Sequence, residues 1–142
     1  MSLLTTSSTV DGIIRRSAAR YRDTTALLFQ DRTWTYTELD AAMSRAAAYL
    51  IDLGLEPGDR VAALGRNSDA YLIGFLACAR AGLVHVPLNY NLRGGELDYL
   101  LTQSRSTVLL VDPDLRDSLR GVGEDHPLHV MPLNRPGFGG GS

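Results

Sequence analysis

The stretch Gly65-Arg66-Asn67-Ser68 has the residue types that best fit anion chemistry in this sequence. An apolar run at 61–64 precedes it, and a second apolar run begins at residue 70. A helix that starts here would present free amides and the positive end of its dipole to an anion. Arg66, Asn67 and Ser68 are therefore our candidate anion-site residues, although helix capping alone also accounts for Asn67 and Ser68.

Lysine-dependent chemistry is excluded, because the chain has no lysine. All fourteen positively charged side chains are arginine, so no lysine is available for a phosphate loop, a Schiff base or general-base catalysis. The acidic residues are scattered, and no pattern pairs two carboxylates across a definable cleft. We therefore predict no catalytic residue in this chain.

The single cysteine and the histidines also favour structural roles. One cysteine excludes an intramolecular disulfide and a cysteine metal cluster, and the apolar neighbours of Cys78 indicate an inert thiol. His126 and His129 have a spacing that could bind zinc from a helix, but Pro127 argues against that helix. His85 lies in an apolar run, where we expect it to pack or to form a hydrogen bond. We predict no bound metal and no cofactor.

The composition is that of a globular domain. Hydrophobic residues make up 44% of the chain and charged residues 21%. The net charge of −2 offers no basic field to a nucleic acid. The most apolar stretch, 70–81, is interrupted by Arg80 and is too short to span a bilayer. Residues 1–10 lack the pattern of a signal peptide, so we predict a cytoplasmic protein.

The first part of the sequence predicts a helix, a hairpin and a second helix. Apolar residues recur at helical spacing over 9–21, with Thr9 as the N-cap. Two short strands, 25–30 and 33–35, are predicted to form a hairpin with its turn at Asp31-Arg32. The sequence Thr35-Tyr36-Thr37-Glu38 has the pattern of a capping box, and it predicts a helix that ends at Gly54.

The remainder alternates strands with helices. Strands are predicted at 60–64, 83–88, 107–111 and 129–133, and helices at 68–81, at 95–103 and after Pro113. In the helix at 95–103 we expect Leu97, Leu100 and Leu101 to face inward. Short apolar strands between amphipathic helices indicate βαβ units. The predicted fold is α/β, with an N-terminal hairpin followed by a mostly parallel sheet covered by helices. The domain spans 1–136, and 137–142 form a flexible glycine-rich tail that resembles a linker.

Four stretches resemble motifs of the adenylate-forming superfamily, which includes acyl-CoA synthetases, peptide-synthetase adenylation domains and luciferases. The first matches a hydrophobic residue followed by Thr-Tyr-x-Glu-Leu. The last is similar to Ala-Gly-x-x-Tyr-Val-Pro-Leu-Asn, with His85 at the position of the tyrosine. All four occur in the family's order and spacing, and the similarity extends over about 10–111. The matching stretches are 34–39, 56–62, 66–82 and 81–89.

The resemblance implies an N-terminal fragment of a fatty acid–CoA ligase, because residues 89–97 are similar to the fatty acyl branch. Such enzymes join a carboxylate to ATP as an acyl-adenylate, with Mg²⁺, and then transfer the acyl group to the thiol of CoA. The family's phosphate loop, acyl pocket and C-terminal domain follow the matched region, so none of their residues maps here. We therefore expect an inactive fragment whose partner is the remainder of the parent chain.

Two other hypotheses stay open. The chain could be a non-catalytic module for dimerisation or complementation, with exposed apolar helix faces such as Tyr71, Leu72 and Phe75 forming a homo-oligomer. It could instead be a small nucleotide-binding α/β protein that converged on similar spacing, with the 66–68 loop as its site.

Overall fold

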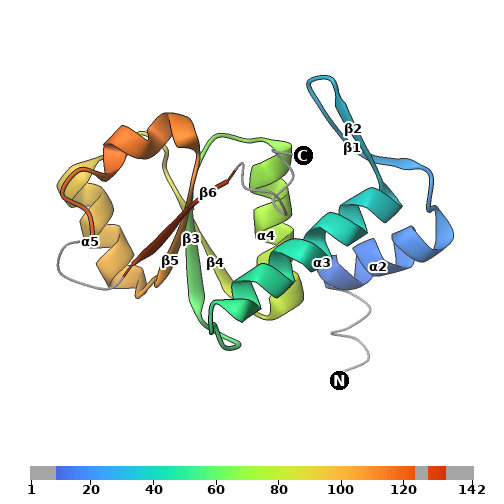
Figure 1. The fold of residues 1–142 in the computed structure, drawn as a ribbon, viewed down its shortest axis with the longest axis horizontal. Helices are drawn as coiled ribbons and strands as arrows, with labels where there is room; N and C mark the ends of the chain where they lie inside the picture. Colours follow the sequence, from blue (N-terminus) through green and yellow to red (C-terminus); the bar gives the residue numbers. More distant parts are fainter. Residues whose placement is uncertain (1–8, 124–127, 134–142) are drawn as a thin grey trace.

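The computed structural model describes residues 9–123 and 128–133 (Figure 1). The predicted tail at 137–142 lies outside the described residues. Two helices and a hairpin come first and are followed by alternating strands and helices, in the order expected from the sequence. The elements are α2 (Val10–Arg20), β1 (Thr25–Phe29), β2 (Arg32–Thr35), α3 (Tyr36–Asp52), β3 (Arg60–Leu64), α4 (Asp69–Ala81), β4 (Val84–Leu88), α5 (Gly94–Ser104), β5 (Val108–Val111), the 3₁₀ helix η1 (Pro113–Leu119) and β6 (His129–Pro132).

The N-terminal boundaries of three helices follow from local capping. Thr9 accepts a hydrogen bond from Gly12 N–H at the start of α2, and Ser68 accepts one from Tyr71 N–H at the start of α4. The capping box of α3 is confirmed. Glu38 N–H donates to Thr35 Oγ1 at 3.1 Å, and Thr35 N–H donates to Glu38 Oε1 at 2.8 Å.

Strands β1 and β2 form an antiparallel hairpin, but the turn lies one residue earlier than predicted. Phe29 pairs with Arg32, so the loop is Gln30-Asp31, and Gln30 adopts a left-handed φ of 54°. Arg32 belongs to β2 because its backbone pairs with that of Phe29. Its guanidinium group also reaches across to α4, a long-range contact that the local turn pattern does not encode.

The other four strands form a parallel sheet in the order β4-β3-β5-β6. Figure 1 shows α3 and α4 on one side of this sheet and α5 on the other. The sheet is therefore covered on both faces, as predicted, which explains why its strands are almost continuously apolar.

Alternate residues of the central strands enter two separate apolar clusters. Val61 and Leu110 pack beneath α3 and α4, whereas Leu64 and Leu109 pack beneath α5 and η1. The expectation for α5 was partly wrong. Its residues Leu97 and Leu101 are fully buried, but Leu100 is 37% exposed. The i, i+4 pair alone faces the sheet, and Leu100 lies on the flank of the helix.

Helix α4 is fixed at its C-terminal end by backbone and charge. Gly82 has a φ of 75°, which an L side chain rarely adopts, and Leu83 N–H bonds to the Cys78 carbonyl across the helix end. Arg80 in the last turn is almost fully buried and forms ion pairs with Asp11 of α2 and Asp40 of α3. These contacts hold the three N-terminal helices together.

Candidate functional site

The candidate binding position lies at the carboxyl ends of the parallel strands. Strand β3 leads through α4 to β4 on one side, while β5 lies on the other side of β3. The connections therefore diverge between β3 and β5, and ligands of open α/β sheets bind at such a point. The loops that leave there are 65–68 and the one that begins at Asp112.

A polar hollow of about 440 Å³ lies at this point. It combines arginine and aspartate side chains from the loops with the tip of the hairpin, so its charges are mixed. Its lining residues are Phe29, Gln30, Arg32, Arg66, Asn67, Ser68, Asp69, Ala70, Asp112, Pro113, Asp114 and Leu133.

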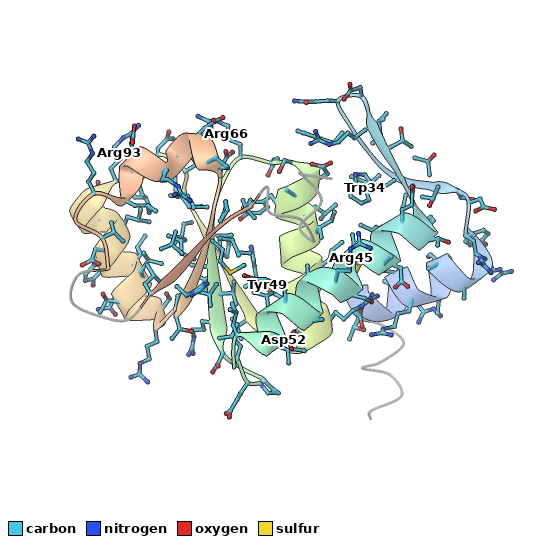
Figure 2. All side chains as sticks on the ribbon, viewed as in Figure 1. Trp34, Arg45, Tyr49, Asp52, Arg66 and Arg93 are labelled. Atoms are coloured by element: carbon cyan, nitrogen blue, oxygen red, sulfur yellow. The ribbon has the colours of Figure 1, made fainter. Side chains whose placement is uncertain are left out.

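The three predicted anion-site residues all line this hollow, and two of them, Arg66 and Ser68, have partners within the protein. The Arg66 guanidinium carbon lies 5.1 Å from the centre of the Tyr90 ring, and Figure 2 shows Arg66 well away from Trp34. Ser68 Oγ is used as the N-cap of α4. The carboxylate of Asp69, in the first turn of α4, already supplies negative charge to that helix end. The anion site remains a prediction.

Asp69 is the buried charge of the site, and sequence reasoning missed it. Its side chain has no solvent exposure, whereas Arg32 is 42% exposed. Arg32 donates through Nε at 2.6 Å and through Nη2 at 2.7 Å, one bond to each carboxylate oxygen. Trp34 Nε1 and the Ala70 amide donate as well, at 3.1 Å and 2.9 Å. Such a bidentate, charge-assisted pair is among the stronger polar contacts in proteins.

Burial alone would raise the pKa of Asp69, but the hydrogen bonds from Arg32 and Trp34 outweigh it and hold that pKa below its usual value. The carboxylate is therefore ionised at neutral pH. Because all its partners belong to the protein itself, its geometry is that of a structural ion pair. No local pattern could have revealed it, since Arg32 and Asp69 are 37 positions apart.

An apolar groove of about 530 Å³ adjoins the polar hollow and shares Phe29 and residues 67–69 with it. The groove runs between β1, α4 and β4. Its lining is completed by Leu27, Tyr71, Leu72, Phe75, His85 and Pro87.

His85 forms part of the floor of the apolar groove. Its ring packs edge-on against Tyr71 at 5.6 Å and Phe75 at 5.2 Å between ring centres. Its Nε2 atom is buried and has no hydrogen-bond partner among the described residues. Burial lowers the pKa of His85, because the charged imidazolium would lose its hydration there. The predicted packing is confirmed.

Stability should therefore depend on pH through His85. Its folded pKa lies below the unfolded value of about 6.5. As pH falls below that value the unfolded chain binds a proton that the folded chain does not, so stability is lost. We expect the free energy of unfolding to fall by at most about 1.4 kcal/mol per pH unit for this one proton. Urea unfolding of the wild type between pH 7.5 and 5 measures this slope.

The variant His85→Phe keeps an aromatic ring against Tyr71 and Phe75 but cannot titrate, so its slope should be smaller. An equal slope in both proteins would contradict the assignment. The carboxylates of Asp11 and Asp69 have lowered pKa values, so their contribution is lost only below about pH 4 and does not overlap with this range.

The other groups of possible chemical interest in the described part of the chain are one thiol and the potential metal ligands. Cys78 is fully buried, and burial raises the pKa of its thiol to about 12, so a thiolate is negligible at neutral pH. Within residues 9–123 and 128–133, no three His, Cys, Asp or Glu side chains could hold a metal ion together. His126 lies outside the described residues. None of the described helices is both long and apolar enough to cross a bilayer.

Comparison with known proteins gives one consistent family. A family model described as "AMP-binding enzyme" matches residues 14–135. The chain is 42% identical over 96 residues to a feruloyl-CoA synthase of Amycolatopsis, a match that covers 68% of the chain and 20% of that protein. It is 33% identical over 116 residues to the medium/long-chain-fatty-acid–CoA ligase FadD6 of Mycobacterium tuberculosis, covering 82% and 19%.

Solved structures agree with the sequence comparison. The N-terminal subdomain of NpsA from Klebsiella oxytoca superimposes with a TM-score of 0.76 at 28% identity, covering 92% of this chain and 32% of that one. This likeness confirms the predicted α/β fold. The chain spans about a fifth of the length of the two curated relatives named above.

Proposed function

This chain belongs to the AMP-binding enzyme family, and we propose from that premise that it forms the N-terminal part of an ATP-dependent acyl-CoA ligase. The observation that carries the proposal is the match over residues 14–135, with CoA ligases among the relatives. The whole enzyme would join a carboxylate to ATP as an acyl-adenylate, release pyrophosphate and then transfer the acyl group to the thiol of CoA.

A fatty acid is our proposed substrate class. The resemblance of residues 89–97 to the fatty acyl branch supports it, as does the similarity to FadD6. The higher identity to a feruloyl-CoA synthase makes an aromatic carboxylic acid the competing substrate. A test of activity therefore needs both kinds of acid.

The role that we assign to this chain is that of a scaffold. ATP, Mg²⁺ and CoA would take part in the reaction of the whole enzyme, and we propose that residues outside this chain bind them. The helix end beside Arg66 already holds the Asp69 carboxylate, which would repel a triphosphate. The sequence also has no lysine to pair with phosphate oxygens.

An ATP–pyrophosphate exchange assay tests this proposal. We expect the chain alone to give background exchange with palmitate and with ferulate. A chimaera in which this chain replaces the matching fifth of the Amycolatopsis feruloyl-CoA synthase should regain exchange with ferulate, within about a hundredfold of that enzyme, an allowance of about 2.7 kcal/mol in the barrier.

Two outcomes would count against the proposal. Turnover by the chain alone would refute the scaffold role. A chimaera that is folded by circular dichroism but inactive with every acid would refute the assignment to the ligase reaction. The same chimaera carrying Phe75→Ser, a change at a partly exposed side chain of the apolar groove, tests whether the rest of the enzyme packs there.

Self-association is a second candidate role, favoured by exposed apolar side chains on α4 and β4. Phe75 is 37% exposed and Val84, on the open edge of the sheet, is 45% exposed. Such a patch is typical of an interaction surface. Sedimentation should then show dimers that Phe75→Ser dissociates, whereas a monomer at high concentration would exclude this role.

A further inference from the structure

The β1–β2 hairpin has an inner and an outer face, set by its register. Leu27 pairs with Trp34, and Phe29 pairs with Arg32. Because strand side chains alternate, these four residues share one face. The opposite face carries Leu28, which is 67% exposed. Figure 2 shows Trp34 on the side of the hairpin nearer α4.

The inner face contacts α4 in two ways. Its polar half, Arg32 and Trp34, donates three hydrogen bonds to the carboxylate of Asp69. Its apolar half, Leu27 and Phe29, forms one wall of the apolar groove, and α4 and β4 form the others. The Arg32 guanidinium carbon also lies 5.3 Å from the Phe29 ring centre, which joins the two halves. The hairpin therefore closes the groove, and Asp69 fixes the closed position.

The base of the hairpin is tied to the chain that flanks it. Tyr36 N–H donates to the Thr24 carbonyl at 3.0 Å, and Thr37 N–H donates to the Arg22 carbonyl at 3.1 Å. The hairpin itself forms a separate two-stranded sheet, apart from the four-stranded one. An isolated hairpin is marginally stable in water, so its order depends on its docking against the helices.

We propose that the β1–β2 hairpin is a hinged wall of the apolar groove, latched to α4 by Asp69, and that it opens as a unit while the parallel sheet stays folded. Opening would pivot at the base, where β1 follows Thr24 and β2 enters α3 at Thr35. It would widen the groove and hydrate Asp69. Arg32 loses little on opening, because it is already 42% exposed. The proposal does not depend on the ligase function.

Hydrogen exchange of the whole chain, read segment by segment by mass spectrometry, tests the hinge. We expect amides of β1 and β2 to exchange at least tenfold faster than those of β3 and β5, because local opening needs less free energy than global unfolding. Two variants then separate the two kinds of opening. Asp69→Ala removes the latch, and Val111→Ala weakens the core beneath α5, on the face of the sheet opposite α4.

Asp69→Ala should speed exchange in the hairpin about tenfold. Val111→Ala should speed exchange in β3 and β5 and leave the hairpin unchanged, because the hairpin opens without unfolding the sheet. Asp11→Ala, which removes another arginine-bound carboxylate, serves as the control and should also leave the hairpin unchanged. Equal acceleration of hairpin and sheet by Val111→Ala would overturn the hinge.

The latch has its own readout. Trp34 is the only tryptophan in the sequence, so its fluorescence reports the docking of the inner face. Asp69→Ala should increase quenching of Trp34 by acrylamide at least twofold with the far-ultraviolet circular dichroism of the domain retained. Unchanged quenching would refute the latch, and it would do so even if the exchange data support a mobile hairpin.

Discussion

Leu110→Ala should cost about 3–4 kcal/mol of the free energy of unfolding, the largest effect that we predict for a single substitution. Leu110 is fully buried in β5, a central strand. It pairs in register with Ala63 on one side and Met131 on the other. All three lie in the cluster beneath α3 and α4. Because the side chain of Ala63 is small, it cannot move to fill the cavity that the substitution creates.

The loss is large relative to the total. A domain of this size is stable by about 5–15 kcal/mol, so Leu110→Ala removes a considerable fraction of it. Urea unfolding measures the change as a lower midpoint with an unchanged slope. Leu100→Ala is the matched control, because it is the same substitution at a 37% exposed position and should cost well under half as much. Similar losses at both positions would contradict the assignment of the core.

Those two leucines also show what the sequence could predict. The helices and strands were predictable because caps and apolar periods are local, as at Thr35 and Glu38. The prediction that Leu100 faces inward was wrong. Leu100 is three positions after Leu97 and Leu101 is four positions after it, and both spacings fit an apolar stripe on a helix. The width of the buried stripe depends on how α5 lies on the sheet, which is a tertiary property.

The order of the strands in the sheet could not be predicted from the alternation of strands and helices. Alternation of strands and helices predicts parallel pairing, but it does not say that β5 adds beside β3 and leaves β4 at the edge. Pro87 is compatible with that position. Val84 N–H donates to the Asp59 carbonyl beside β3, so the N–H of residue 84 points toward β3. Backbone N–H groups of a strand point to alternate sides, so the nitrogen of residue 87 points away from β3. A proline there therefore removes no hydrogen bond between β4 and β3. Proline thus identifies an edge strand only after the pairing is known.

The local structure around the candidate site was predictable, whereas the anion site itself stays a prediction. The loop 65–68 was identified correctly as a helix start at the end of a strand, and its residues 66–68 line the polar hollow. A cap and an anion site use the same residue types, so the loop alone could not distinguish them. The structure adds Asp69, whose carboxylate occupies the helix end and takes its partners from a strand far away in sequence. No local period connects those positions.

Arg32→Ala should lower the melting temperature by about 5–10 °C, more than Asp69→Ala, although the two changes break the same ion pair. Removing Arg32 leaves a fully buried carboxylate with only the Trp34 and Ala70 donors. Removing Asp69 leaves an arginine that is already 42% exposed and that water can solvate. The penalty therefore lies mainly with the carboxylate, because an unpaired buried charge costs more than the pair contributes. Thermal unfolding of both variants and of the double variant measures the asymmetry.

The pH dependence separates this cause from a general loss of packing. In the wild type the pKa of Asp69 is held low, so its contribution is present at neutral pH and is lost as pH falls below about 3.8. In Arg32→Ala burial is no longer outweighed, so the folded pKa of Asp69 should rise above its unfolded value. The protonated carboxyl is then favoured in the folded state, and the loss of stability in the variant relative to the wild type should shrink between pH 7 and pH 4.

In the double variant Arg32→Ala/Asp69→Ala this loss of stability should be smaller than in Arg32→Ala alone and should not change over that range. A deficit in Arg32→Ala that stays constant with pH would mean that Arg32 stabilises the hairpin by its contact with Phe29 and not by neutralising Asp69.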